Sequence, residues 1–235
     1  MLQLYGMSSP NVLKIMILLE ELGCSYDFHT VNLSAGEQFS EAFTALNPMR
    51  KVPVLIENRE NGAPMVIFES GAILIYLAEK FGRFLPPASD SRYQVLQWLL
   101  VETATAGPTL GHYNHYLRFA PEDTYSLSRF RTLAGRAYDM FDERLQTQEY
   151  LANDEYSVAD MALFPWVEYF HEFHQMSAAE HPALMRWRAT IKTRPAVAAA
   201  LERYQNIVAN DRSFSQKPDP DTLDRVLGRG KFARP

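Results

Sequence analysis

The chain has 235 residues, 47% of them hydrophobic and 22% charged, and its 28 acidic and 23 basic side chains give a net charge of −5. This composition is ordinary for a globular protein. A phosphate backbone requires a basic surface, which an excess of acidic residues does not favour, so we expect no nucleic-acid partner. No apolar run reaches the length of a membrane span, and no signal-peptide pattern is present, so we expect no membrane association. The single cysteine, Cys24, excludes an internal disulfide. We expect it to be a small buried filler in a cytoplasmic protein.

The N-terminal part of the chain alternates between strand and helix patterns. Pro10 begins and Gly23 follows the clearest helix, and Asn61-Gly62 indicates a hairpin turn between two strands. The predicted strands are 2–5, 26–33, 52–57 and 64–68, and the predicted helices are 10–22, 36–46 and 69–81. This order is typical of one mixed sheet with helices over its faces.

Only helical patterns follow a linker at 82–90 that contains two prolines. A helix over 91–107 is predicted to stop or kink at Gly107-Pro108. Ser157-x-x-Asp160 is a capping-box variant, which satisfies amide donors at a helix start. The other predicted helices are 121–146, 157–170, 181–194 and 195–208.

These patterns divide the chain into an α/β domain at 1–82, an all-helical domain at 91–210 and an extended tail at 211–235. The polar, broken composition of the tail favours a poorly ordered terminus. The alternative is a strap that packs over the other domain.

Two serines and an asparagine stand where the first helix begins, in "MSSPNVLKI" (7–15). Free N–H groups and the helix dipole at such an end favour negative charge and lower the pKa of a thiol. A hydroxyl and the Asn11 amide would add hydrogen bonds to a thiolate. Because the stretch has no cysteine, that thiol would arrive with a ligand. The alternative is that Ser9 or Asn11 only caps the helix.

A proline stands at the entry to a buried strand, in "KVPVL". Proline cannot donate to a strand ladder, so Pro53 lies at an edge or in a bend. A cis Val52–Pro53 bond would expose the Val52 N–H and C=O to an extended peptide ligand, whereas a trans bond would make an ordinary strand start.

Polar residues also stand at the start of the helix in "FESGAI". Either they form a plain cap, or Glu69 holds the ammonium of an amino acid while the helix start at Ser70 holds its carboxylate. Gln38 and Lys51 lie near the same edge of the sheet and could meet peptide or carboxylate groups. Together these signals predict a slot for a short anionic peptide that carries a thiol.

Several stretches together resemble the glutathione transferase superfamily, namely "SSPNVLKI", "NPMRKVPVL", "FESGAILIYLAEKFG", "SVADMALFPWV" and "HPALMRWRATIKTRPAV". The resemblance extends to about residue 208. "GEQF" and "GPTLGHYNHYLRFAPE" make it nearest to the bacterial Nu class and the fungal nitrogen-regulator-like branch. It implies a thioredoxin-like N-terminal domain, an all-helical C-terminal domain, and a homodimer that binds glutathione between them.

In that group a hydroxyl residue and an asparagine contact the glutathione sulfur, which implies Ser9 and Asn11 here. Serine stands where threonine is common in the Nu class, so the choice between Ser8 and Ser9 stays open. Arg129 is implied to reach across the dimer to a second glutathione or its carboxylates, although Arg131 and Arg136 lie on the same helix. The residues predicted to bind glutathione within the subunit are Gln38, Lys51, Val52, Pro53, Glu69 and Ser70.

Two histidine pairs, at 112 and 115 and at 171 and 174, have a spacing that could hold a metal on a helix. Neither pair has an evident third ligand, so we expect no metal site. His112 and His115 fall where the superfamily lines its second-substrate pocket; packing beside a kink is the alternative.

The sequence therefore predicts a glutathione-dependent enzyme that activates the glutathione thiol. Small disulfides and organic peroxides are the expected acceptors, with weaker conjugation to electrophiles. Two alternatives keep the same fold. One is a glutathione-binding or regulatory protein without turnover, and the other is a dehalogenase or ring-cleaving isomerase.

Overall fold

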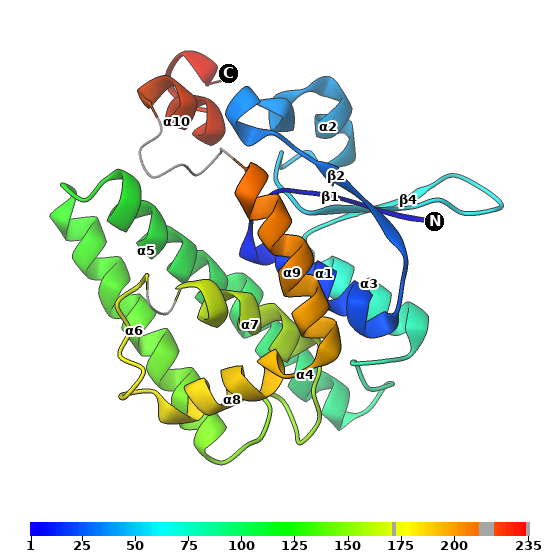
Figure 1. Ribbon diagram of the computed structural model, residues 1–235, viewed down its shortest axis with the longest axis vertical. Helices are drawn as coiled ribbons and strands as arrows, with labels where there is room; N and C mark the ends of the chain where they lie inside the picture. Colours follow the sequence, from blue (N-terminus) through cyan, green and yellow to red (C-terminus); the bar gives the residue numbers. More distant parts are fainter. Residues whose placement is uncertain (171–172, 212–218, 234–235) are drawn as a thin grey trace.

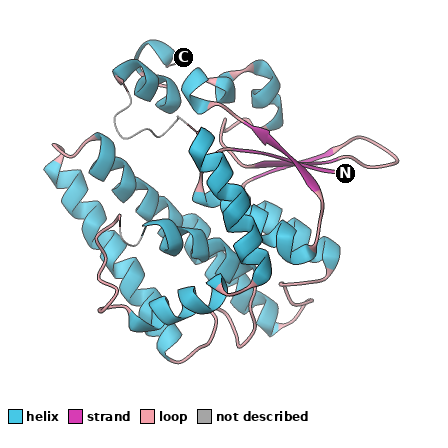
Figure 2. Cartoon of the chain, viewed as in Figure 1, coloured by secondary structure: helices cyan, strands magenta, loops and turns pink. Residues whose placement is uncertain are grey.

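A four-stranded mixed sheet forms the N-terminal part of the molecule (Figure 1, Figure 2). The computed structural model describes residues 1–170, 173–211 and 219–233. The strand order is β2-β1-β3-β4, with β1 parallel to β2 and every other neighbouring pair antiparallel. The strands are Leu2–Gly6 (β1), Tyr26–Thr30 (β2), Val54–Glu57 (β3) and Met65–Phe68 (β4). The expected mixed sheet is confirmed.

Different helices cover the two faces of the sheet. The helices of this part are α1 (Pro10–Leu22), α2 (Glu41–Leu46) and α3 (Ser70–Phe81). Leu4 and Leu55 point to one face and join the core that contains α1 and α3. Val54 and Ile56 point to the other face, where Phe43 of α2 covers them. This division follows from the alternation of side chains along a strand.

Three expected elements of this part are wrong in length. The strand predicted over 52–57 begins only at Val54, after the proline. Strand β2 ends at Thr30, so the predicted strand 26–33 is too long, and a 3₁₀ turn, η1 (Leu33–Ala35), follows it. The predicted helix 36–46 is divided into a 3₁₀ turn, η2 (Glu37–Phe39), and α2. The break lies at Ser40, whose backbone is extended and whose Oγ accepts a hydrogen bond from the Phe43 N–H at 3.2 Å.

The rest of the described chain is helical. Its helices are α4 (Asp90–Val101), η3 (Glu102–Ala106), α5 (Gly107–Phe119), α6 (Thr124–Gln146), α7 (Val158–Phe170), α8 (Pro182–Lys192), α9 (Pro195–Asn210), α10 (Pro220–Leu227) and η4 (Gly230–Phe232). Together with the sheet, this is the predicted glutathione transferase fold. No described helix has both the length and the apolar character that crossing a membrane requires.

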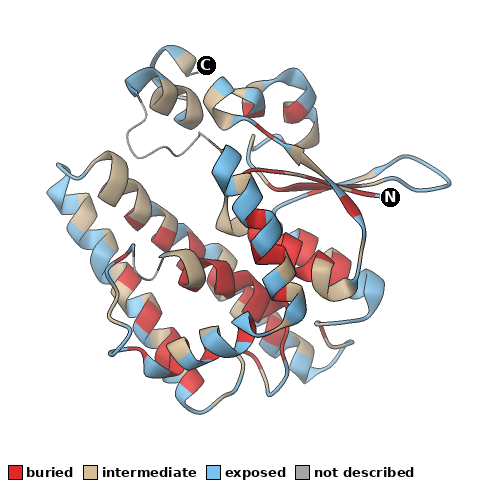
Figure 3. Cartoon of the chain, viewed as in Figure 1, coloured by how far each residue is buried: buried red, intermediate tan, exposed pale blue. Residues whose placement is uncertain are grey.

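Helix α1 begins and ends where the sequence predicts. Pro10 occupies its first position, where no N–H is needed, and Gly23 terminates it in the left-handed conformation with φ 67°. Every residue of 12–19 is buried, and Figure 3 shows buried residues gathered along α1 and α7. The reason is that α1 packs against α3 on one side and against α7 and α9 on the other.

The expected stop or kink at Gly107-Pro108 is instead a widened helical turn. The Gly107 N–H donates to the carbonyl of Glu102, five residues earlier, which makes η3 a π-helical turn between α4 and α5. Pro108 has no N–H to donate and its ring crowds the preceding turn, so the extra residue of a π turn accommodates it. The helix therefore continues through this point.

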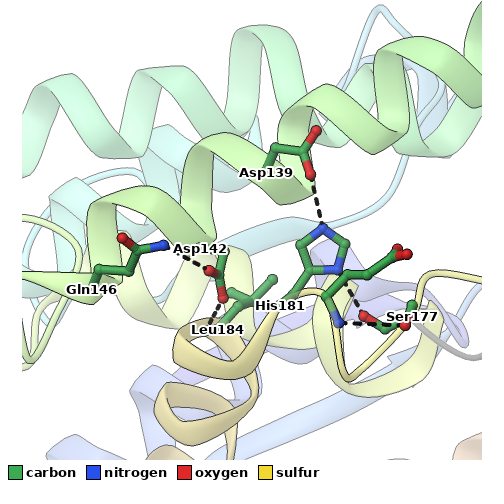
Figure 4. A network of polar contacts seen from close by, with 7 residues as sticks. Asp139, Asp142, Gln146, Ser177, His181 and Leu184 are labelled. Atoms are coloured by element: carbon green, nitrogen blue, oxygen red, sulfur yellow. Dashed lines mark hydrogen bonds and ion pairs between the residues drawn. The ribbon is translucent and has the colours of Figure 1, made fainter.

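Buried polar contacts fix the helices of this domain to one another. His181, at the start of α8, hydrogen-bonds through Nε2 to Asp139 Oδ1 at 3.1 Å and through Nδ1 to the Ser177 carbonyl at 2.9 Å (Figure 4). Asp142 accepts the Leu184 N–H at 2.9 Å in the same view. These contacts hold α8 against α6.

The predicted capping box is confirmed at the start of α7. Asp160 is fully buried and accepts the Ser157 N–H and hydroxyl, each at 3.0 Å. It also accepts the Leu151 N–H and the Trp187 Nε1–H, each at 2.9 Å. Burial raises the pKa of Asp160, and these donors oppose that rise.

The chain end that we call the C-terminal arm, residues 219–233, packs on the sheet domain beside η1 and α2 (Figure 1). Arg225 of α10 donates from Nη1 to the Ser34 carbonyl at 3.0 Å. Gly228 ends α10 with φ 63° and lies against the Phe39 ring. The expectation of a poorly ordered terminus is therefore wrong for these residues, and the strap alternative describes them. Residues 212–218 and 234–235 of the predicted tail lie outside the described residues.

Candidate active site

Two adjoining chambers form one cleft between the sheet domain and the helical domain. The larger chamber has a volume of about 640 Å³ and lies among the start of α1, α5, α7, the end of α9 and α10. The smaller chamber, of about 430 Å³, lies among the starts of α1 and α3 and the junction of η3 with α5. The residues that line both are Lys51, Val52, Gly111, His115 and Trp166.

Every predicted site residue except Arg129 lines this cleft. In the larger chamber these residues are Ser9, Gln38, Lys51 and Val52. In the smaller chamber they are Asn11, Lys51, Val52, Pro53, Glu69 and Ser70. Arg129 is exposed in a separate groove on α6, beside Tyr125 and Arg136.

The two serines before α1 have different hydrogen-bond partners. Ser8 donates its hydroxyl proton to Asp211 Oδ2 at 2.5 Å, and its N–H donates to the same oxygen at 2.9 Å. The Ser9 Oγ accepts the Asn11 N–H at 3.2 Å, which leaves the Ser9 hydroxyl proton available to donate. Ser9 is therefore the better placed of the two to donate to an anion in the cleft.

The amide groups at the start of α1 are already bonded, contrary to the expectation of free N–H donors. Pro10 has none, the Asn11 N–H bonds to Ser9 Oγ, and the Val12 N–H bonds to the Ser9 carbonyl at 3.0 Å. What this end offers an anion is the Ser9 hydroxyl, the Asn11 carboxamide and the positive end of the helix dipole.

The Val52–Pro53 peptide bond is cis. Val52 lines both chambers and lies two residues before the first residue of β3. Neither its N–H nor its C=O bonds to another backbone group within the described ranges 1–170, 173–211 and 219–233. Both groups are thus open to an extended peptide, which is the arrangement that the sequence raised as one of two alternatives.

Glu69 and Ser70 form the start of α3 at the opposite wall. Glu69 has φ 69° and ψ 116°, a backbone conformation that costs a residue with a Cβ about 1–3 kcal/mol. Its side chain makes no capping hydrogen bond, so the plain-cap alternative does not apply to Glu69. The exposed Glu69 carboxylate and the nearly buried Ser70 both line the smaller chamber.

Comparison with known proteins identifies the family. Residues 1–79 match the family model for the glutathione S-transferase N-terminal domain, and residues 118–195 match that for the C-terminal domain. Disulfide-bond oxidoreductase YfcG of Escherichia coli (strain K12) is 36% identical over 218 residues, which are 92% of this chain and 100% of that protein. The chain belongs to the glutathione S-transferase family.

Solved structures with the same fold include members of this family with bound ligands. A glutathione transferase family member from Pseudomonas fluorescens pf-5, with two glutathione bound, has a TM-score of 0.80 and 34% identity, covering 86% of this chain and 92% of that one. Glutathione transferase URE2P6 from Phanerochaete chrysosporium, in complex with oxidized glutathione, has a TM-score of 0.82 and 29% identity, covering 88% and 97%. One of these structures comes from a bacterium and the other from a fungus, in keeping with the bacterial and fungal groups that the sequence resembles.

This glutathione S-transferase has a buried ion pair beside the smaller chamber that sequence reasoning did not find. Lys14 of α1 donates from Nζ to both carboxylate oxygens of Glu102, each at 2.9 Å, and their side chains are 0% and 1% exposed. Burial raises the pKa of Glu102, and the Lys14 charge opposes the rise. A lysine within the apolar run "VLKIMILL" was the available signal.

Gln38 has a partner that the sequence did not predict. Its Nε2 donates to the Val226 carbonyl of the C-terminal arm at 3.2 Å, and its Oε1 is buried without a hydrogen-bond partner in the described part of the chain. The arm therefore occupies the donor end of this side chain and leaves the acceptor end for a ligand.

The larger chamber of the transferase is mostly apolar beyond the start of α1. Aromatic side chains from α5, α7, α9 and the turn at Phe173, together with aliphatic side chains from α10, line it, namely Phe119, Trp166, Tyr169, Phe173, Tyr204, Leu223, Val226 and Leu227. Such a wall suits an apolar second substrate.

The predicted second-substrate histidines differ in position. His115 lines both chambers, and burial lowers its pKa, helped by the nearby Arg229 and His112. His112 lines the smaller chamber and stacks on Phe130 with 5.0 Å between ring centres. Within the described residues, no three His, Cys, Asp or Glu side chains gather as metal ligands would; position 171 of the second pair lies outside them.

Proposed function

We propose that the protein is a glutathione-dependent enzyme that ionises the glutathione thiol, so that the thiolate attacks and reduces small disulfides and organic peroxides. The proposal rests on two hydrogen-bond donors that face the cleft at a point where the protein has no cysteine. Ser9 and Asn11 offer a hydroxyl proton and a carboxamide at the positive end of α1, where a thiolate is favoured. Cys24, in contrast, lines neither chamber, and burial raises its pKa.

The cleft supports one orientation of glutathione. The γ-glutamyl end lies in the smaller chamber, with its ammonium at Glu69 and its carboxylate at the start of α3. The cysteinyl unit pairs with the backbone of Val52, which lines both chambers. This placement brings the sulfur to Ser9 and Asn11, beside the apolar wall of the larger chamber.

Disulfide reduction then needs two molecules of glutathione, and no side chain of the protein has to be oxidised or reduced. The bound thiolate attacks one sulfur of the acceptor, and the other sulfur leaves as a thiolate that takes up a proton. A second glutathione attacks the resulting mixed disulfide, which yields glutathione disulfide and the second reduced thiol. The name of YfcG, a disulfide-bond oxidoreductase, and the two glutathione bound in the Pseudomonas fluorescens structure support this scheme.

Peroxide reduction follows from the same thiolate. It attacks the peroxide oxygen to give a sulfenic acid and an alcohol, and a second glutathione converts the sulfenic acid to glutathione disulfide and water. Conjugation to aryl halides is expected to be weak.

A homodimer completes the proposal. The exposed position of Arg129, away from the chambers of its own subunit, supports the role across a dimer interface that the family resemblance implies.

The test is steady-state turnover of glutathione with hydroxyethyl disulfide, cumene hydroperoxide and chlorodinitrobenzene. Losing one hydrogen bond to a thiolate costs about one to two pKa units. Ser9→Ala and Asn11→Ala should therefore lower the rate at neutral pH about tenfold to a hundredfold and raise the pKa of the rate profile. Ser8→Ala is the matched control and should keep most of the activity, because its hydroxyl already donates to Asp211.

Glutathione that binds without turnover of any acceptor would establish a binding protein instead of an enzyme. Equal losses in Ser8→Ala and Ser9→Ala would contradict the assignment of the donor. A protein that does not bind glutathione would overturn the proposal as a whole.

A further inference from the structure

His115 of α5 lies where the two chambers of the cleft meet. It lines the larger chamber together with Ser9 and the smaller chamber together with Asn11, the two residues that offer donors to a thiolate. Gly111, one helical turn earlier on the same face of α5, also lines both chambers. Because glycine has no side chain, His115 provides the side chain that α5, which is described over its whole length, presents to both chambers.

Packing holds the ring of His115, and its nitrogens remain available to the cleft. The ring centre lies 5.4 Å from that of Tyr116 and 5.5 Å from that of Phe119 on the same helix. Neither ring nitrogen hydrogen-bonds to a residue in the described part of the chain. His181, in contrast, uses both of its ring nitrogens to hold α8 against α6. The two nitrogens of His115 are thus open to a ligand.

The surroundings of His115 favour its neutral form. Burial lowers its pKa below the ordinary value of about 6.5, and the nearby Arg229 and His112 lower it further. Arg118 and Lys51 also line the larger chamber and add positive charge to it. A neutral imidazole accepts a proton from a donor beside it, and the imidazolium that forms in these surroundings gives the proton up readily.

The other ionisable groups of the larger chamber are less suited to carry a proton. Burial raises the pKa of Tyr169 to about 12 and raises that of Tyr204 as well, so both phenols keep their protons. Asp211 already accepts the hydroxyl proton and the N–H of Ser8. The arginine and lysine side chains offer donors alone and do not take up a proton. His115 is therefore the group best placed to move a proton between a bound sulfur and an acceptor.

We propose that His115 is a catalytic residue that takes the proton of the glutathione thiol and gives it to the atom that leaves the acceptor. This inference rests on the proposed function and supplies the proton that its leaving group takes up. In disulfide reduction, the thiol proton moves to a ring nitrogen of His115 while the sulfur attacks one sulfur of the acceptor. The S–S bond breaks with its electron pair on the other sulfur, which takes the proton from His115. The imidazole is neutral again, and the acceptor is the oxidant.

Acceptors differ in how much they need this proton. A peroxide releases an alkoxide and an alkyl disulfide releases an alkyl thiolate. Both are basic anions, so a proton delivered as the bond breaks speeds their departure. Chlorodinitrobenzene releases chloride, which needs no proton. The contribution of His115 should therefore be large for the first two acceptors and small for the third.

The test measures turnover of the full-length protein with cumene hydroperoxide, hydroxyethyl disulfide and chlorodinitrobenzene at saturating glutathione. His115→Gln removes the group that carries the proton, and His115→Phe keeps an aromatic ring without nitrogen. Both variants should lose peroxide and disulfide turnover by about a hundredfold or more, the range for general acid–base catalysis. Conjugation to chlorodinitrobenzene should fall by less than about tenfold, because Ser9 and Asn11 still favour the thiolate.

Two controls separate this role from packing. His29→Gln is the matched control, since His29 of β2 stacks on Tyr5 with 4.6 Å between ring centres and lines neither chamber. It should leave all three rates unchanged. The thermal midpoint and the remaining conjugation activity of the His115 variants report whether they are folded.

The inference is overturned if the variants slow all three reactions equally, or if His115→Phe reduces peroxides and disulfides as fast as the wild type. Either result, with a wild type that turns over all three acceptors, would refute the role of His115 and leave the proposed function in place. A wild type that binds glutathione but turns over no acceptor would refute the proposed function, and the role of His115 with it.

Discussion

The buried ion pair between Lys14 and Glu102 leads to the largest stability effect that we predict. The Lys14 ammonium is fully buried and donates to both oxygens of Glu102 at 2.9 Å. Lys14→Met keeps an unbranched side chain, one atom shorter, and removes the charge together with its hydrogen-bond donors. Glu102 is then an unpaired buried carboxylate, and breaking such a pair costs about 3–5 kcal/mol. For a chain of this size, the thermal midpoint should fall by roughly 6–20 °C.

The pH dependence of this loss has a defined sign. Burial raises the pKa of folded Glu102, and Lys14→Met removes the charge that opposes the rise. A carboxyl group whose folded pKa is raised contributes stability below its unfolded pKa, and this contribution is lost as pH rises through the folded pKa. The difference between wild type and Lys14→Met should therefore be largest near pH 8 and shrink toward about pH 5.

Thermal unfolding of three variants checks the reasoning. Adding Glu102→Gln to Lys14→Met removes the unpaired charge and should restore at least part of the lost stability. Lys80→Met is the control, because Lys80 is 38% exposed and its partner Glu57 keeps a hydrogen bond from the Tyr76 hydroxyl when the lysine is replaced. A pair with an exposed cation contributes about 0–1 kcal/mol. If Lys14→Met lowers the midpoint no more than Lys80→Met does, the argument from burial is wrong.

Three further predictions concern the helical domain and the arm. Asp160→Ala leaves several buried donors without an acceptor, and each such donor costs about 1–3 kcal/mol. Thermal or urea unfolding should therefore show that the free energy of unfolding falls by several kcal/mol. A fall of less than about 1 kcal/mol would contradict this prediction. Gly228→Ala places a Cβ 2.7 Å from the Phe39 ring at φ 63°, so limited proteolysis should cut the arm faster while the thermal midpoint stays the same; unchanged cutting would argue against the packing. The pKa of His115, measured by NMR titration, should lie below the ordinary value of about 6.5, and a value above it would refute the burial argument.

The sequence predicted the boundaries of an element correctly where the residues at its two ends determine them. The bounds of α1 are correct because Pro10 and Gly23 act through their own backbone geometry. The division of helix 36–46 was missed because a serine fits a helix start and a helix interior alike, and only its extended backbone distinguishes them. The same holds for Gly107-Pro108, where a π turn and a kink have one sequence pattern.

The sequence patterns did not predict contacts between distant parts of the chain. The polar composition of the arm predicted disorder, yet Gln38 bonds to Val226, 188 residues away. Lys14 and Glu102 are 88 residues apart and belong to different domains. The family resemblance supplied most of the candidate site, but it did not indicate that Arg50 also lines the larger chamber.

The C-terminal arm makes part of the binding surface separable from the folding core. Leu223, Val226 and Leu227 of the arm line the larger chamber, but none of them is among the buried core residues of either domain. The choice of acceptor can thus diverge among related chains, or be redesigned in the laboratory, by rewriting the last few turns of the polypeptide alone. An affinity tag fused after residue 235 would lie only a few residues from the helix that lines the larger chamber. A tag at the N-terminus is therefore the better choice for kinetic measurements.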